Sequence, residues 1–528
     1  MNPVSANSVH AARAGRREWI GLAVLALPCL LYSMDLTVLN LAVPSLTADL
    51  EPSSSQLLWI VDIYGFLVAG SLITMGTLGD RIGRRRLLLI GAATFGMASV
   101  LAAFSTSAEM LIATRALLGV AGATLAPSTL SLIRNMFLDP GQRTTAIGMW
   151  ATSYSVGAAI GPLLGGVMLE HFWWGSVFLV GVPVMLLLLA LGPSLLPEFR
   201  DPKAGRLDLV SAALSLAAVL AVIYGLKRIA EDGLGWLAAL SILAGIAAGA
   251  AFVRRQQGLA DPLIDLRLFR APTFNASLAT NALAIFVAFG PFVFIAQYLQ
   301  LVLGLSPLQA GLWTLPSSGG FIVGSMLAPI LVRRARAAYV IAAGLVLAAV
   351  GLMVLTQADG TSGLAILVAG SVVLALGISP AVTLSTDLII SAAPPERAGA
   401  AAALSETSAE LGGALGIAIL GSIGTAVYCA RVGDAVPAGV PPEVAEAARA
   451  TLGGAVAAAE QLPTQLGAAL LGVAREAFVQ SFEVTAAISA GIVIAAAVVA
   501  AVLLRHVRTG PEPEPRLDHA TDGPSRVG

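Results

Sequence analysis

Long apolar runs separated by short polar turns dominate this chain of 528 residues. A helix needs about 20 apolar residues to cross the hydrocarbon core of a bilayer, and fourteen runs are long enough to do so. None of them alternates apolar and polar positions as the strands of a membrane barrel do. The pattern therefore predicts an all-α integral membrane protein. Its predicted transmembrane helices lie near residues 19–42, 56–78, 87–105, 109–136, 145–169, 176–196, 207–226, 236–253, 273–301, 309–332, 338–357, 363–390, 398–428 and 484–504.

Basic residues are unevenly distributed between the two sets of turns. With the N-terminus inside the cell, the cytoplasmic segments hold 24 of the 30 Lys and Arg residues, and the outer loops hold five. The remaining one, Arg115, lies within a predicted helix. Lys and Arg near membrane helices mark the cytoplasmic side, so we expect a multi-pass protein of the plasma membrane with both termini cytoplasmic.

The composition excludes several classes of protein. Only 12% of the residues are charged and 57% are hydrophobic, whereas about a quarter of the residues of a soluble domain are charged. The net charge of −1 gives no indication of a nucleic-acid partner. Two cysteines and four scattered histidines predict neither a disulfide framework nor a metal site. We expect no cofactor and no enzymatic activity, because no nucleophile is grouped with a base.

The turns divide the fourteen helices into groups of six, two and six. The turn at residues 139–143 and the turn at residues 394–397 both combine Pro and Arg, and a Gly-rich helix follows each. This faint duplication is typical of transporters built from repeats, although chance similarity between such turns is the alternative. We expect a cytoplasmic tail at 1–18, six-helix bundles at 19–200 and 256–510, and two inserted transmembrane helices at 201–255. An outer helical hairpin at 429–483 and a disordered tail at 511–528 complete the expected organisation.

Ionisable residues within membrane helices are costly and usually functional. Asp35, Asp62 and Arg115 belong to three helices of the first bundle and lie at similar depth, in the outer half of the membrane. One interpretation is a structural ion pair between Arg115 and one aspartate. Because one arginine cannot neutralise two carboxylates, the other interpretation is that the second aspartate titrates during transport.

Two further acids lie in the second bundle. Glu406 and Glu410 are four residues apart, so they share one face of a helix, and Glu410 lies near the middle of the membrane. They indicate a site for a proton or a cation, whereas the alternative is a protonated glutamate that is hydrogen-bonded to a neighbouring helix. Asp387, near the cytoplasmic end of its helix, we interpret as a solvated or capping charge.

The turn between the second and third predicted helices contains Gly and Asp followed by several Arg residues. The residues concerned are Gly76, Asp80, Arg81, Gly83, Arg84 and Arg85. Their spacing resembles the signature of the major facilitator superfamily. The resemblance implies two pseudo-symmetric six-helix bundles, with two helices inserted between them, and it implies that this turn acts as a gate rather than as a binding site.

A second element lies in the fifth predicted helix and consists of Gly157, Gly161, Pro162, Gly165 and Gly166. Glycines four apart allow another helix to approach closely, and a proline within a helix removes a backbone hydrogen bond. As chemistry alone this is a packing surface. It also resembles the element that marks the antiporters of the superfamily.

Further motifs, at residues 31–44 and 115–119, resemble those of the fourteen-helix drug:proton antiporters. The resemblance implies a monomeric, proton-coupled exporter of drugs, mainly of lipophilic monocations, in which Asp35, Asp62, Arg115, Glu406 and Glu410 couple proton and drug. In that branch an acid in the tenth helix is associated with dicationic substrates, and residues 309–332 contain none. A dedicated exporter of one endogenous metabolite or antibiotic is the alternative, because the coupling motifs would be the same.

Overall fold

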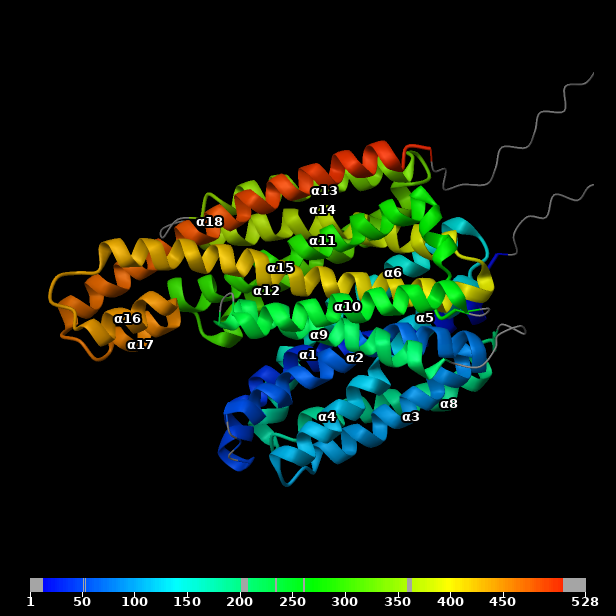
Figure 1. Ribbon diagram of the computed structural model, residues 1–528, viewed down its shortest axis with the longest axis horizontal. Helices are drawn as coiled ribbons and strands as arrows, with labels where there is room; N and C mark the ends of the chain where they lie inside the picture. Colours follow the sequence, from blue (N-terminus) through cyan, green and yellow to red (C-terminus); the bar gives the residue numbers. More distant parts are fainter. Residues whose placement is uncertain are drawn as a thin grey trace, which may run out of the picture.

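The helices of this protein run side by side along one long axis (Figure 1). The computed structural model describes residues 13–50, 52, 54–200, 208–232, 235–259, 262–358 and 363–506. Within these residues there is no strand, and fourteen helices or helix groups are long and apolar enough to cross a membrane. The predicted all-α membrane fold with fourteen transmembrane helices is therefore confirmed. The disordered tail expected at 511–528 lies outside the described residues.

The helices of the first half of the chain are α1 (Arg16–Leu50), α2 (Ser54–Ile82), α3 (Arg84–Ala103), α4 (Ala108–Gly122), α5 (Leu125–Met136), α6 (Pro140–His171), α7 (Ser176–Leu179) and α8 (Gly181–Leu195). Two helices follow them, α9 (Leu209–Asp232) and α10 (Trp236–Gly258). The second half contains η1 (Leu266–Arg270), α11 (Pro272–Gln297), η2 (Tyr298–Val302), α12 (Pro307–Leu331), α13 (Ala337–Leu355), α14 (Gly363–Ala392), η3 (Pro395–Arg397), α15 (Ala398–Ala435), α16 (Pro442–Ala450), α17 (Leu452–Ala459) and α18 (Thr464–Leu503).

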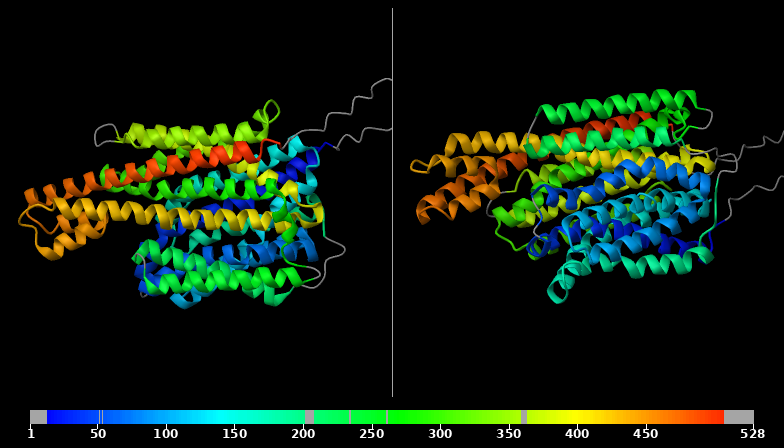
Figure 2. Two further views of the ribbon diagram at one scale, coloured as in Figure 1. Left: turned by 45° about the horizontal axis from the view of Figure 1, so that its top comes forward. Right: turned by 60° about the horizontal axis from the view of Figure 1, so that its bottom comes forward.

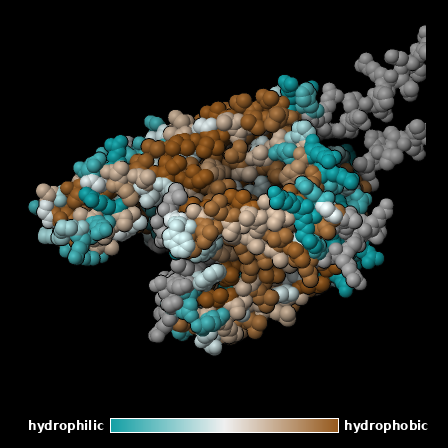
Figure 3. Space-filling view, in the orientation of Figure 1, coloured by the Kyte–Doolittle hydropathy of each residue, from teal (hydrophilic) through white to brown (hydrophobic). Residues whose placement is uncertain are grey.

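The two ends of the molecule differ in shape. At one end, called here the terminal end, α1 begins and α18 finishes (Figure 1). At the other, the hairpin end, α15 and α18 extend beyond the remaining helices and carry α16 and α17, as both views in Figure 2 show. On the face shown in Figure 3, hydrophobic residues cover most of the surface between the ends and polar residues gather at the ends. A lipid bilayer would cover such an apolar belt.

Each half of the chain has its own hydrophobic core. The larger part of one core comes from residues 22–196 and the other comes from residues 276–504. Helix α9 packs against α10 and also contacts both α2 and α15. Phe66 of α2, Ile223 of α9 and Leu411 of α15 belong to one small cluster. The extra helix pair thus lies beside the boundary where α2 of the first half meets α15 of the second.

Glycine allows the same close approach of two helices in both halves. A Cβ atom on Gly157 of α6 would lie 2.1 Å from the carbonyl oxygen of Leu30 of α1. A Cβ atom on Gly416 of α15 would lie 2.2 Å from the carbonyl oxygen of Phe286 of α11. Each distance is far below van der Waals contact, so only glycine fits. The first helix of each half thus packs against the Gly-rich helix of that half.

Several boundaries differ from the sequence prediction. The helix predicted at 109–136 is divided into α4 and α5, because Pro127 has no N–H to donate to the carbonyl group of Ala123. In the segment predicted as an outer hairpin at 429–483, α15 extends to Ala435 and α18 begins at Thr464, with α16 and α17 between them. These two long helices therefore extend beyond the predicted transmembrane segments.

Candidate functional site

Arg115 forms an ion pair inside the first half. Its Nη1 atom lies 2.6 Å from Oδ2 of Asp35, and its Nε donates to the carbonyl oxygen of Ile60 at 3.2 Å. The guanidinium group also lies over the rings of Tyr64 and Phe178, 4.6 and 5.9 Å from their centroids. The arginine side chain is only 1% exposed. Because it is held from several sides, Arg115 is a fixed positive charge beside Asp35.

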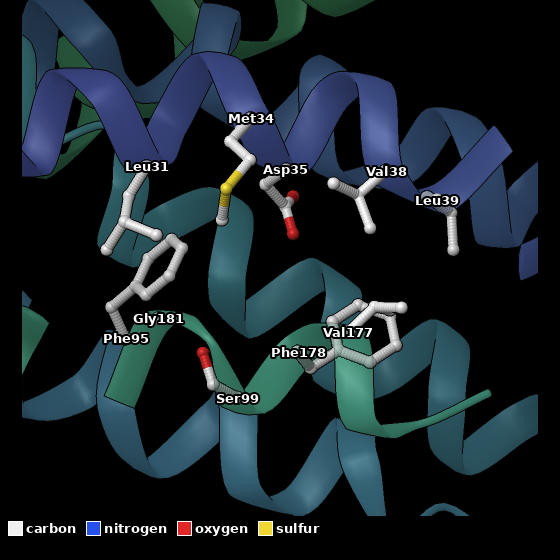
Figure 4. Close-up of a pocket in the computed structure, with 10 residues that line it drawn as sticks. All are labelled: Leu31, Met34, Asp35, Val38, Leu39, Phe95, Ser99, Val177, Phe178 and Gly181. Atoms are coloured by element: carbon white, nitrogen blue, oxygen red, sulfur yellow. The ribbon is translucent and has the colours of Figure 1, made fainter. Parts of the chain in front are cut away.

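The Asp35 carboxylate also reaches a small cavity. Figure 4 shows it directed from α1 into a space that is bordered by α3 and α7. Ser99 and Phe178 are among the residues that line this space, whose volume is about 10 Å³. A volume of this size holds about one water molecule. The cavity can hydrate Asp35, but it cannot hold a drug molecule.

Asp62 was predicted to be the second acid near Arg115. It belongs to α2, but its side chain lies outside the described residues. The structure therefore brings Arg115 together with Asp35, and the proposed role of Asp62 stays a prediction.

Glu410 accepts a hydrogen bond from across the boundary between the halves. The hydroxyl group of Tyr32, on α1, donates to Oε1 of Glu410, on α15, at 2.7 Å. Glu406 lies one turn nearer the terminal end and is partly buried. Within the described part of the chain, Glu406 has neither a hydrogen bond nor an ion pair with a basic residue. Two like charges so close together raise each other's electrostatic energy unless a proton or a cation joins them.

The arginine-rich turn connects the two halves at the terminal end. Asp80 accepts hydrogen bonds from the backbone N–H groups of Gly399 and Ala400, both at 3.1 Å. These groups belong to the first turn of α15, where free N–H groups and the helix dipole favour a negative charge. Arg84 pairs with Asp80 at 2.7 Å and donates to the carbonyl oxygen of Pro395 at 2.8 Å. Both charged side chains are buried.

A second charged contact at this end was not predicted. Asp387 of α14 is buried, forms an ion pair with Arg143 of α6 at 2.9 Å, and accepts from the hydroxyl group of Thr144 at 2.6 Å. Our interpretation of Asp387 as a solvated or capping charge is wrong, because the facing helix supplies a cation and a hydroxyl donor. We call Asp80, Arg84, Arg143 and Asp387 the terminal network.

The other residues of the turn have different surroundings. Arg85 donates to the carbonyl oxygens of Pro193 and Leu196 at 3.1 and 3.0 Å, so it contacts the end of α8 in its own half. Gly83 has φ = +110°, a conformation that strains any residue with a side chain. Arg81 is partly buried in the last turn of α2.

The turn therefore contains both contacts between the halves and contacts within the first half. Gly76 belongs to the first group, because a Cβ atom there would lie 2.5 Å from the carbonyl oxygen of Gly399. This glycine lets α2 and α15 meet closely beside the terminal network.

The glycines of α6 also differ in their surroundings, since some are packed against other residues and one is exposed. Gly157 contacts the backbone of α1, as described above, and Gly161 and Gly165 are buried. Gly166 is exposed, with no atom within 4 Å of an added Cβ. Helix α6 continues through Pro162, whose side chain lies outside the described residues.

The sequence analysis did not single out Tyr32, which contacts Glu410 across the boundary between the halves. A tyrosine three residues before Asp35 resembles any other core aromatic residue, and its partner Glu410 is 378 positions away. The only available signal was its position on the helix that carries Asp35.

Two helical halves with separate cores are joined at one end by a buried ion pair and by hydrogen bonds from buried charged side chains, and they carry acids at mid-depth. These features define the class of membrane transporters that work by moving two bundles. A sequence model described as "Major Facilitator Superfamily" matches residues 25–417. The chain belongs to this superfamily. It is therefore a transporter and not an enzyme.

Relatives with descriptive names cover nearly the whole chain. The multidrug efflux pump LfrA of Mycolicibacterium smegmatis is 48% identical over 93% of this chain and 97% of its own length. The methyl viologen resistance protein SmvA of Salmonella typhimurium is 38% identical over 89% of this chain and 94% of its own. The crystal structure of the human organic anion transporter MFSD10 aligns with a TM-score of 0.58 and 14% identity, over 92% of this chain and 99% of that one. This last likeness concerns the fold alone.

Proposed function

We propose that this protein is a proton-coupled multidrug exporter that moves lipophilic, mainly monocationic compounds out of the cell by alternating access. The observation that carries the proposal is the placement of acids within the membrane on both sides of the boundary between the halves. Asp35 belongs to the first half, whereas Glu406 and Glu410 belong to the second. Ionisable groups at such positions are typical of proton and ion pathways.

The names of the relatives support the direction of transport and the class of substrate. LfrA is named as a multidrug efflux pump, and it aligns with nearly all of this chain. SmvA is named for resistance to methyl viologen, an organic dication, so its name supports a cationic cargo but not the preference for monocations. Resistance of this kind is explained by export, and membrane acids suit a positively charged cargo.

The distribution of basic residues supports the sidedness. Arg84, Arg85 and Arg143 lie at the terminal end, and Lys and Arg favour the cytoplasmic side. In this proposal the terminal end is cytoplasmic, and the terminal network closes the cytoplasmic side of the transporter. We further propose that the protein acts as a monomer in the plasma membrane, because each chain contributes both bundles and the acids between them.

Coupling follows from competition for the carboxylates. An ionised carboxylate attracts a lipophilic cation, and a protonated one does not, since unlike charges attract strongly at low dielectric constant. Protons that enter from outside therefore release the drug there. The site then loses its proton to the less acidic cytoplasm and can bind drug again.

Transport into everted membrane vesicles tests this mechanism. Ethidium uptake should require an imposed pH gradient, and an ionophore that dissipates the gradient should stop it. Uptake with ATP alone, in the presence of the ionophore, would contradict proton coupling. Vesicles that carry the Asp35→Asn variant, for which no transport is expected, give the matched background value of ethidium uptake.

The same vesicles test substrate class. A panel of monocations, dications and neutral drugs should show good export of monocations and poor export of long dications, because α12 offers no acid as a second partner for a dication. Methyl viologen is a dication, so a comparison of its export with that of ethidium tests the predicted preference for monocations directly. Export of one compound alone would favour a dedicated exporter of an endogenous metabolite or antibiotic.

A further inference from the structure

One hydrogen bond joins the two halves at a depth well away from the terminal network. It runs from the hydroxyl group of Tyr32 to Oε1 of Glu410, over 2.7 Å. At ~1.5 Å per residue, Tyr32 lies roughly 24 Å along α1 and Glu410 roughly 18 Å along α15 from the helix ends at the terminal side. The bond therefore lies deep in the membrane, where the halves must separate when the transporter opens.

The first half fixes the position of the Tyr32 ring. The ring lies 6.0 Å from the ring of Tyr64 and 5.8 Å from that of Tyr154, measured between centroids. Tyr32 is also part of the first hydrophobic core and is only 8% exposed. Its hydroxyl group thus has little freedom to point elsewhere. Glu410 is partly exposed and has more room to move.

The chemistry of this contact bears on cargo binding. A carboxylate oxygen can accept a hydrogen bond, bind a proton or attract a cation, and a hydroxyl donor that occupies it weakens the other two. The bond is strongest when the carboxylate is ionised. That is also the state in which the carboxylate would attract a cationic drug.

We propose that Tyr32 is a positioning residue that competes with cationic cargo for Glu410. While the site is empty, the Tyr32 hydroxyl holds the carboxylate and joins the halves. A lipophilic monocation displaces the hydroxyl from the carboxylate. Cargo binding therefore breaks a contact between the halves. The inference rests on the proposed function in one respect, namely that the cargo is a cation.

Equilibrium binding to the purified, full-length protein in detergent tests the inference without any proton gradient. The probe is tetraphenylphosphonium, at one fixed pH, with triphenylphosphine oxide as a neutral compound of similar shape. Tyr32→Phe keeps the ring and removes the competing hydroxyl. Its Kd for the cation should fall about tenfold, because a hydrogen bond to a charged group is worth about that factor. Its Kd for the neutral compound should not change.

Two further variants separate competition from a structural effect. Tyr154→Phe removes a hydroxyl from the same cluster that has no hydrogen-bond partner among the described residues, so cation binding should stay at the wild-type value. Glu410→Gln should weaken cation binding, and adding Tyr32→Phe to it should bring no further gain. Melting temperatures of all variants verify that each is folded.

Each deviation from this pattern overturns the inference. Unchanged or weaker cation binding by Tyr32→Phe would do so, as would an equal gain in Tyr154→Phe or a gain that persists without the Glu410 carboxylate. If the wild type still exports cations, the proposed function survives such a result. Absence of cation binding in every variant would overturn both proposals together.

Discussion

Asp35 and Glu406 are both carboxylates in membrane-spanning helices, but their surroundings differ. Asp35 lies 2.6 Å from a buried guanidinium group that is itself held by a carbonyl group and two aromatic rings. Glu406 has no basic partner within the described part of the chain, and its neighbour on the same helix face is another acid, Glu410. Within the described part of the chain, Asp35 thus has a basic partner, whereas Glu406 does not.

This difference assigns different tasks to the two halves. Where a fixed arginine stabilises the ionised carboxylate, protonation must compete with an ion pair, and the state of Asp35 is tied to the position of Arg115. Where no fixed cation is present, a proton or a cationic substrate must supply the positive charge. In the proposed mechanism, Asp35 therefore responds to protons alone, whereas proton and cationic cargo compete at the Glu406–Glu410 pair.

The largest expected effect is that of Asp35→Asn. The change leaves Arg115 buried without its counter-charge, and breaking a buried pair in this way costs about 3–5 kcal/mol. We expect export of every substrate to fall to the level of vesicles without the protein. The measurement is ethidium and neutral-drug uptake, normalised to the amount of protein in the membrane. Full activity of this variant would show that the ion pair has only a structural role.

Glu406→Gln should have a smaller and more selective effect. Removal of one negative charge near the cargo should reduce export of monocations roughly tenfold, since a single Coulomb interaction at intermediate dielectric constant is worth that much or more. Export of neutral drugs should fall much less. If both classes fall equally, Glu406 serves the proton and not the cargo, and the division of tasks between the halves is wrong.

The terminal network allows a comparison of two adjacent arginines. Arg84→Ala removes the partner of Asp80 and a bond to the second half, so the closed terminal end should become less stable and export several-fold slower. Arg85→Ala removes contacts to Pro193 and Leu196 within the first half, and export should change little. Drug binding should be unaffected in both variants. Equal slowing by the two changes would contradict the assignment of Arg84 to the contact between the halves.

The sequence predicted the number of helices, the fold and the acids, because these depend on local composition and on motifs with fixed spacing. It could not predict which acid forms the ion pair with Arg115, since that depends on how the helices pack. It also could not find the contacts between Tyr32 and Glu410 or between Arg143 and Asp387, which join residues more than 240 positions apart. Asp387 illustrates the error most clearly. Its position near a helix end suggested that its side chain is exposed to solvent, but the facing helix α6 buries it and supplies its partners.

The smallest effect is expected for an ion pair at the surface. Asp208 lies just before α9, and Nε of Arg255 donates to its Oδ2 at 2.6 Å. This hydrogen bond lowers the pKa of Asp208 below its usual range. A lowered pKa in the folded state adds stability above the carboxyl pKa of the unfolded chain, and this stability is lost as the pH falls through the lowered value. Because the pair is open to water, Asp208→Asn should lower the Tm at neutral pH by less than about 2 °C, and by nothing at very low pH.

Export should be unchanged, so this variant is also the control for Asp35→Asn: both remove the acid of an Asp–Arg pair, one in the membrane and one at its surface. Equal losses of export in the two variants would mean that export depends on any Asp–Arg pair, and not on the buried pair of Asp35 and Arg115 in particular.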